Sequence, residues 1–250
     1  IADFAGWRGI FWLMFAAGLV LLALTVFALQ ETLPRRQNLK TKDRTPESVR
    51  KSASILFSDP IFIAIVLQQF LASCVLFGHI SSSPFIFREH FGLSPELYGL
   101  AFGGMALAIT VGAAVSGRLA SPLKAIFLGA AGILFSSLLL ALGFALQASI
   151  FPTILCYVLV LASLGLTLPA AMTAALTLHR ARAGFAAAIL GSVTFVGGGI
   201  IAPFTAMADA RLCVSIIFLS SGLLLVLLSL WLSRRMRLEN AQGNAIQLDE

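Results

Sequence analysis

The chain has 250 residues, of which 59% are hydrophobic and only 11% are charged, and its mean hydropathy is +0.96. These values lie outside the range of soluble globular domains. A net charge of +6 would suggest a nucleic-acid partner in a soluble protein. In so apolar a chain we attribute the excess to the orientation of a membrane protein, and we expect no nucleic-acid binding.

Six long stretches of the chain lack Asp, Glu, Lys and Arg altogether: 9–30, 60–87, 97–117, 125–179, 183–208 and 212–233. About 20 apolar helical residues cross a bilayer core of about 30 Å, so the stretch 125–179 is long enough for two spans. Because lipid offers no partners to backbone polar groups, runs of this length must be helical. The sequence therefore predicts an all-α polytopic membrane protein with seven transmembrane helices.

The basic residues fall in alternate gaps between these stretches. Seven Lys and Arg lie in residues 31–52, two in 118–124, two in 180–182 and three in 234–237. The remaining gaps hold only Arg8, Arg88 and Arg211. By the positive-inside rule we expect the 31–52 loop and the C-terminus to be cytoplasmic and the N-terminal end to be outside, in a bacterial inner membrane.

The spacing of the spans predicts the domain organisation. One span, in residues 1–30, is followed by a basic polar segment, 31–54, which contains two helix-breaking prolines. Six spans with short connections then fill residues 55–235, and 236–250 form a tail. Secondary transporters are built from helical halves joined in this way. We interpret the four segments as the last helix of an N-terminal half, a cytoplasmic linker, a six-helix C-terminal half and a cytoplasmic tail.

Several short strings lie in order at the ends of the predicted spans: GWRGIFW, LQETLP, SSSPFIFREHFGLSPELYGLAF, SGRLASPLK, LTLPAAMTAAL and RARAGFAAAILGSVTFVGGGIIAP. Together they resemble the bicyclomycin/chloramphenicol-resistance branch of the major facilitator superfamily, the twelve-helix drug:proton antiporters. The resemblance runs from Trp7 to about Arg235 and assigns the seven spans to helices 6–12. Because the chain begins with Ile1, we expect helices 1–5 to be missing from it.

The resemblance implies a function and a set of partners. It implies proton-coupled efflux of small lipophilic drugs by alternating access, with the proton gradient as energy source and no cofactor. The implied partners are the drug, protons, membrane lipids and the missing N-terminal half of the same protein. An exporter or symporter of a metabolite such as an amino acid or sugar, on the same fold, stays open as the alternative.

Two positions depart from the pattern of this branch. The string Ala120-Ser121-Pro122-Leu123 lacks the Asp of the superfamily's basic loop signature, and Ala170 stands where the branch usually has Asn. The resemblance also implies that the proton-coupling carboxylates lie in the first helix, outside this chain.

Candidate gate and hinge residues are prolines, glycines and their neighbours near span ends or in small-residue patches. Pro84 either bends the tip of its helix or ends it, and Arg118 is either a conformational latch or plain positive-inside charge. Glycine-rich segments permit close helix contact, which fits either a rocking interface or static packing. The full set is Ser83, Pro84, Gly117, Arg118, Pro169, Gly197, Gly198 and Gly199.

Polar and aromatic side chains within spans are the candidates for a substrate cavity, because intramembrane polar residues usually face the interior of a bundle. They are Gln68, Gln69, Ser73, Phe77, Thr110 and Thr173, of which Gln68 and Gln69 either contact a substrate or form hydrogen bonds between helices. We expect His79 to lie at the interface, with a proton carrier as the alternative, and the three cysteines to be small buried hydrophobes. With no carboxylate in the core of any span and no metal-ligand spacing, we expect neither an intramembrane enzyme nor a metal site.

Overall fold

The computed structural model describes residues 2–28, 49–207 and 209–248, and the chain separates into two units, Ile1–Pro46 and Glu47–Glu250. The first unit contains one helix, α1 (Ala2–Ala28), which is interrupted at Gly6 (φ +62°). Only glycine adopts such a φ routinely, so the apolar part of the helix begins just after it. The predicted linker residues 31–48 lie outside the described part of the chain.

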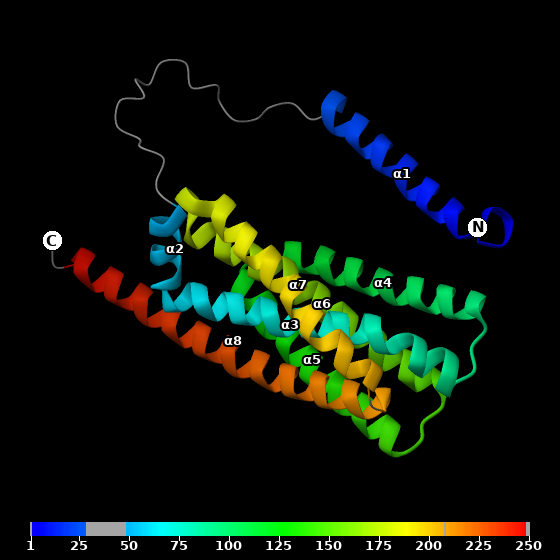
Figure 1. Ribbon diagram of the computed structural model, residues 1–250. Helices are drawn as coiled ribbons and strands as arrows, with labels where there is room; N and C mark the ends of the chain where they lie inside the picture. Colours follow the sequence, from blue (N-terminus) through cyan, green and yellow to red (C-terminus); the bar gives the residue numbers. More distant parts are fainter. Residues whose placement is uncertain (1, 29–48, 208, 249–250) are drawn as a thin grey trace. The chain divides into compact units, whose positions relative to one another are not determined.

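The second unit is a bundle of antiparallel helices joined by short connections (Figure 1). Its elements are α2 (Val49–Phe57), α3 (Pro60–Pro84), the π-helix η1 (Phe85–His90), α4 (Pro95–Arg118), α5 (Pro122–Ala145), α6 (Ile150–Leu178), the 3-10 turn η2 (Arg180–Arg182), α7 (Ala183–Met207) and α8 (Ala210–Leu248). No strand forms in the residues described. The helix α2 crosses the predicted boundary at residue 54, and α8 extends through most of the predicted tail.

Three helices of the bundle begin with proline directly after a polar residue. Asp59 accepts hydrogen bonds from the backbone N–H groups of Ile61 and Phe62, and Ser94 accepts one from Leu97. Ser121 occupies the same position before α5. Proline is suited to the first helical position because its missing N–H would have no partner there. The sequence Ser94-Pro95-Glu96 is typical of a helix start, with a capping serine, a first-position proline and an acid in the first turn, and α4 begins there.

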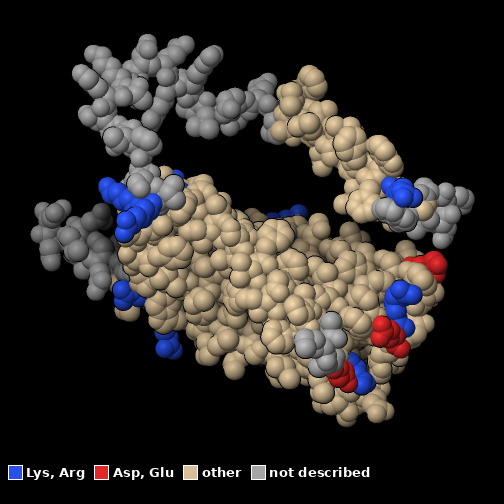
Figure 2. Space-filling model, viewed as in Figure 1, with Lys and Arg blue, Asp and Glu red and all other residues tan. Residues whose placement is uncertain are grey.

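Seven helices in the described part of the chain are long and apolar enough to cross a membrane. The face of the bundle in Figure 2 shows a broad uncharged band, with Lys and Arg at one end and a mixture of acidic and basic residues at the other. The connections with Arg118, Lys124, Arg180 and Arg182 lie at one end, called here the basic end, and the η1–α4 and α7–α8 connections lie at the opposite end. The all-α, multi-pass membrane fold is confirmed.

Two apolar clusters form the core, one toward each end. The cluster at the opposite end includes Val75, Met105 and Leu161, and the cluster at the basic end includes Phe62 and Ala171. Helices α3, α5, α6 and α8 contribute buried side chains to both clusters. Helix α4 contributes buried side chains only to the first cluster, and α7 only to the second.

Helices α4 and α6 touch at glycines. A Cβ atom on Gly112 would overlap the carbonyl oxygen of Ala162, and one on Gly165 would overlap that of Ile109. Small residues allow such approach in lipid, where no hydrophobic force drives helices together. Gly112 is buried at this contact, whereas the predicted hinge residue Gly117 is exposed and a Cβ atom there would meet no other atom within 4 Å.

Substitution of Gly112 by alanine is expected to destabilise the bundle. The new methyl group would push α4 off α6, and overpacking of this kind costs about 1–3 kcal/mol. Gly143→Ala is the matched control, because its methyl group meets only Ala148 at an ordinary 3.6 Å. We expect the thermal midpoint of the purified protein, followed by fluorescence-detected gel filtration, to fall by roughly 5 °C for Gly112→Ala only. Equal midpoints would contradict the packing described.

Candidate functional site: the polar face of helix α3

Helix α3 carries a group of polar side chains that are buried inside the bundle, away from lipid. Six of its polar residues are buried: Gln68, Gln69, Ser73, His79, Ser82 and Ser83. Three of them, Gln68, Gln69 and Ser73, are predicted cavity residues. Polar groups at membrane depth are costly and usually serve function. The polar face of α3 is therefore the candidate site.

One side of this face packs against α7. The Gln69 Nε2 donates to Thr194 Oγ1 at 2.9 Å. Further along, Gly197 lies so close to Ser73, and Gly198 so close to Phe77, that neither glycine has room for a Cβ atom. The structure thus brings two predicted cavity residues together with two predicted hinge glycines. In this conformation, side chains of α3 fill the space beside the glycines.

Gln68 has a different environment. Its side chain is fully buried, yet neither its Nε2 nor its Oε1 has a hydrogen-bond partner among the described residues. It lies along α3 between Ile65 of one apolar cluster and Ala72 of the other. A buried amide without partners costs about 1–3 kcal/mol. Gln68 therefore offers one donor group and one acceptor to any molecule that reaches this level of the bundle.

The other predicted site residues lie on exposed surfaces. Thr110, Gly117 and Arg118 are exposed on α4, and Pro169 and Thr173 are exposed on α6. The structure does not bring these residues into the polar face of α3. The Thr173 hydroxyl donates to the Pro169 carbonyl at 2.9 Å, and α6 continues through the proline. Gly199 is exposed as well, and a Cβ atom at this position would meet no other atom within 4 Å.

The α-helix α3 ends at Pro84, but the helical backbone continues directly into the π-helix η1, which runs to His90. Pro84 therefore marks a change of helix type and not the end of the helical segment. Proline removes the hydrogen bond to the carbonyl four residues before it. The Ser83 hydroxyl contacts that carbonyl, on Ile80, at 3.3 Å, and lies 2.9 Å from the hydroxyl of Tyr98. A serine next to the proline thus replaces the lost interaction, and the wider π-helix follows.

His79 is the residue that the sequence placed wrongly. Its side chain is only 3% exposed, so it is not interfacial. The ring stacks on Phe102, with centroids 5.4 Å apart, and lies 5.1 Å from Tyr157. His79 lies three helical turns after Gln68 on the same face of α3, so the spacing in the sequence could have indicated that both side chains face the interior of the bundle. The cysteines also differ from expectation, because only Cys74 is buried and Cys156 and Cys213 are half-buried.

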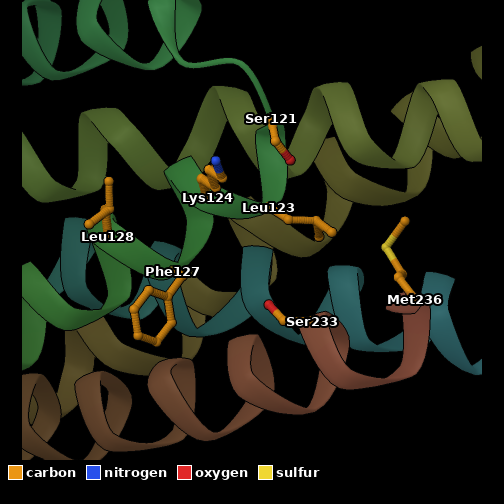
Figure 3. Close-up of a pocket in the computed structure, with 7 residues that line it drawn as sticks. All are labelled: Ser121, Leu123, Lys124, Phe127, Leu128, Ser233 and Met236. Atoms are coloured by element: carbon orange, nitrogen blue, oxygen red, sulfur yellow. The ribbon is translucent and has the colours of Figure 1, made fainter. Parts of the chain in front are cut away.

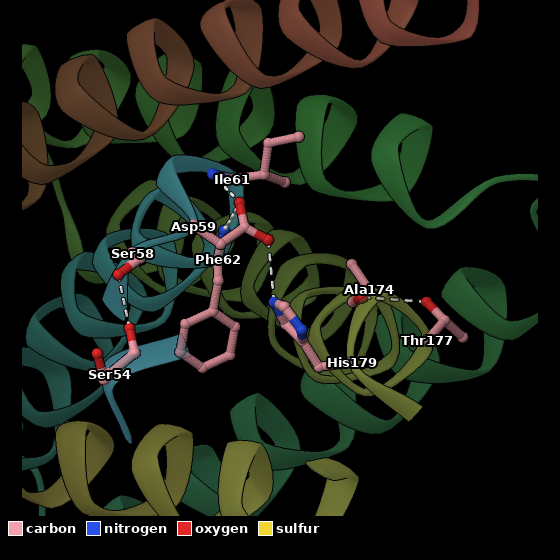
Figure 4. Close-up of polar contacts among 8 residues, drawn as sticks. All are labelled: Ser54, Ser58, Asp59, Ile61, Phe62, Ala174, Thr177 and His179. Carbon is pink, nitrogen blue, oxygen red and sulfur yellow. Dashed lines mark hydrogen bonds and ion pairs between the residues drawn. The ribbon is translucent and has the colours of Figure 1, made fainter. Parts of the chain in front are cut away.

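At the basic end, one carboxylate joins α3 to α6 (Figure 4). Asp59 caps α3 with its Oδ1 and contacts His179 Nε2 with its Oδ2 at 2.9 Å. The His179 ring also packs edge-on against Phe62, with centroids 5.4 Å apart. His179 directly follows the last residue of α6, so this contact fixes the ends of the two helices together.

A cavity of about 390 Å³ lies at the basic end between the start of α5 and the end of the apolar part of α8 (Figure 3). Its lining residues are Ser121, Leu123, Lys124, Phe127, Leu128, Ser233 and Met236. It contains none of the predicted site residues. Among the residues described, no group of three or more His, Cys, Asp or Glu side chains could hold a metal ion.

Replacement of Asp59 by alanine is expected to lower stability more than replacement by asparagine. Alanine removes both the cap and the contact with His179, whereas asparagine keeps an oxygen that can cap α3; loss of a cap alone costs about 1 kcal/mol. We expect thermal midpoints in the order wild type, Asp59→Asn, Asp59→Ala. An alanine variant as stable as the asparagine variant would show that the cap contributes nothing.

Comparison with known proteins identifies the fold family. A family model described as Major Facilitator Superfamily matches residues 1–203. A curated relative, the "Uncharacterized MFS-type transporter YdgK" of Bacillus subtilis (strain 168), is 26% identical over 215 residues, which cover 84% of this chain and 52% of the relative. The chain thus spans about half the length of the relative it matches, and no solved structure matches it. Seven membrane-length helices together with a family match over most of the chain show that the protein belongs to the Major Facilitator Superfamily of membrane transporters.

Proposed function

We propose that the chain is part of an exporter that moves small lipophilic drugs outward in exchange for protons, by alternating access. Membership of the superfamily supports transport. The resemblance to the bicyclomycin/chloramphenicol-resistance branch supports drug efflux, and assigns this chain to helices 6–12 of the whole protein. The missing N-terminal half would be its partner within the same polypeptide.

The observation that carries the proposal is the chemistry of the polar face of α3. It presents amides, hydroxyls and one imidazole, and residues 60–87 contain no Asp, Glu, Lys or Arg. An apolar pocket with a few polar groups suits a lipophilic molecule that is oriented by one or two hydrogen bonds. The unpartnered amide of Gln68 can supply one donor and one acceptor. A zwitterionic amino acid would need charged partners that this face lacks.

The exposed faces of α4 and α7 support alternating access. On α4, Gly103 and Gly104 have no atom within 4 Å of a Cβ position, and the same holds for Gly191 and Gly199 on α7. Thr110 is exposed and follows Gly103 by two helical turns, so both lie on the same side of α4. Small residues let a second helical body approach closely and slide. The remainder of the transporter would supply that body.

A metabolite exporter or symporter is the second candidate. The superfamily match is equally compatible with it. It would require that polar groups outside this chain recognise a hydrophilic substrate, because the charge-free face of α3 provides few.

The orientation gives a prediction. With 14 of 17 basic residues in the gaps assigned to the cytoplasm, the C-terminus is expected to be cytoplasmic in the bacterial inner membrane. A C-terminal green fluorescent protein fusion should fluoresce, and a C-terminal alkaline phosphatase fusion should be inactive. The reverse pattern would overturn the orientation.

Efflux is tested with the complete reading frame that contains this chain, expressed in a pump-deficient bacterium. Accumulation of chloramphenicol or a lipophilic dye should fall, and an uncoupler should restore it. Accumulation that is unchanged over a broad drug panel, with export of a labelled amino acid or sugar instead, would favour the second candidate.

Gln68→Leu separates substrate recognition from stability. Leucine removes a buried amide that has no partner among the described residues, so the thermal midpoint should stay the same or rise. Drug efflux should fall about tenfold, the effect of losing roughly one hydrogen bond of about 1.4 kcal/mol. Ser220→Ala, an exposed position on α8, is the control and should leave both quantities unchanged. Full efflux by Gln68→Leu would remove Gln68 from the substrate path.

A further inference from the structure

We propose that His79 is a proton-binding site inside the six-helix bundle, and that its protonation loosens the packing of α3 against α4 and α6 at the end opposite the basic end. The site is argued from the geometry of this chain. Only the use of the proton in transport rests on the proposed function.

The imidazole lies in an aromatic enclosure contributed by several helices. Phe102 of α4 stacks almost parallel to it, with an angle of 11° between the planes, and Tyr157 of α6 is tilted beside it at 49°. Tyr157 is itself fully buried against Phe87 and Phe218, at centroid distances of 5.4 and 6.0 Å. The site is therefore closely packed and shielded from bulk solvent in this conformation.

The ring has a protonation site that nothing in the surrounding packing uses. The His79 Nδ1 is buried and has no hydrogen-bond partner among the described residues. A core position that needed only volume could hold an apolar ring without the cost of an unpartnered polar atom. A proton from water at this end of the bundle can add to the free lone pair of the ring, which then carries an N–H on both nitrogens and a charge of +1. Deprotonation returns the proton to water, so no other reactant is needed.

The surroundings make the closed packing sensitive to that charge. The titratable side chains in the apolar cluster around His79 are Tyr98 on α4 and Cys156 and Tyr157 on α6; Cys74 is buried on α3 itself, and η1 and α8 present Phe87 and Phe218 to the cluster. Residues 60–87, 97–117, 125–179 and 212–233 contain no Asp, Glu, Lys or Arg, and the charged or titratable residues at this end of the bundle are Arg88, Glu89, His90, Glu96, Asp209 and Arg211. Aromatic faces attract a cation, but a dehydrated cation without a counter-ion remains costly.

Protonation of His79 therefore disfavours the closely packed arrangement around the ring, and that arrangement in turn disfavours the protonated ring. A proton that binds better to a hydrated arrangement shifts the population toward that arrangement. The consequence is an opening of the α3–α4–α6 contact around Phe102 and Tyr157 whenever His79 is protonated.

The backbone near His79 is suited to such a rearrangement. Its immediate neighbour Gly78 has Phe218 within 3.2 Å of a Cβ position, so the helix is closely packed behind the histidine. Pro84 and η1 follow, where the regular α-helical hydrogen bonding is already replaced. π-helical turns are frequent at functional sites. The turn into α4 then passes through Gly92 at φ +69°. The segment between α3 and α4 can therefore change conformation at Pro84, η1 and Gly92 without the loss of regular α-helical hydrogen bonds.

Hydrogen exchange followed by mass spectrometry tests the proposal on the complete protein in nanodiscs, between pH 8 and pH 6, after correction for the intrinsic exchange rate. In the wild type, peptides from residues 79–102 should exchange about tenfold faster at pH 6, while peptides from residues 61–72 of the same helix should not change. His79→Gln should remove the pH dependence. His90→Gln, the same substitution at an exposed residue of η1, should keep it.

Two results would overturn the proposal: no pH dependence in residues 79–102 of the wild type, or the same dependence in His79→Gln. If His79→Gln does not fold, a wild type without pH dependence in residues 79–102 still overturns the proposal. The proposed function is tested separately by efflux. Local opening that depends on His79, without uncoupler-sensitive efflux, would keep the proton site and reject drug:proton exchange. Uncoupler-sensitive efflux without local opening would show that the transported proton binds at a residue other than His79.

Discussion

Every polar group within the membrane must find its partner inside the protein, and this requirement shapes the whole bundle. Helices satisfy the backbone, and most intramembrane hydroxyls donate to a carbonyl one turn earlier in their own helix. Ser82 donates to Gly78, Ser137 to Ile133, and Ser163 to Leu159. Such hydroxyls need nothing from a neighbouring helix. Against this background, Gln68 and His79 are informative because they have polar atoms for which the described part of the fold supplies no partner.

The same requirement explains how the helices are arranged. Contacts between helices rest on shape more than on polar attraction: Gly112 and Gly165 bring α4 and α6 together, and Gly197 and Gly198 admit Ser73 and Phe77. Polar links of α3, or of the residue before it, reach three other helices: Gln69 contacts Thr194, Ser83 contacts Tyr98 and Asp59 contacts His179. A separate link joins the Ser116 hydroxyl of α4 to the Leu166 carbonyl of α6. Helix α3 is thus tied by polar side chains to α4, α6 and α7.

The spans and the helix starts could be predicted from the sequence, because charge-free length and the Ser94-Pro95 signature are local properties. The buried face of α3 was predicted in part, since Gln68, Gln69 and Ser73 are polar residues in an apolar run. The partners of these residues could not be predicted, because the contact of Gln69 with Thr194, or of Asp59 with His179, depends on how distant helices align. His79 was misplaced because its depth in the bundle is set by Phe102 and Tyr157, which belong to other helices. Thr110 and Thr173 show the converse: a polar residue in a span need not face the interior of its own bundle.

The division of the core into two clusters has a mechanical consequence. Helix α4 contributes buried apolar side chains only to the cluster at one end of the bundle, and α7 only to the cluster at the other end, while α3, α5, α6 and α8 contribute to both. Helices α3, α5, α6 and α8 therefore connect the two clusters, whereas α4 and α7 are each packed into one cluster, at opposite ends of the bundle. Movement of α4 at the basic end, or of α7 at the opposite end, exposes few of the apolar side chains that hold the other helix. Such a bundle can open at one end and then at the other, and in each case the apolar cluster at the end that stays closed remains packed.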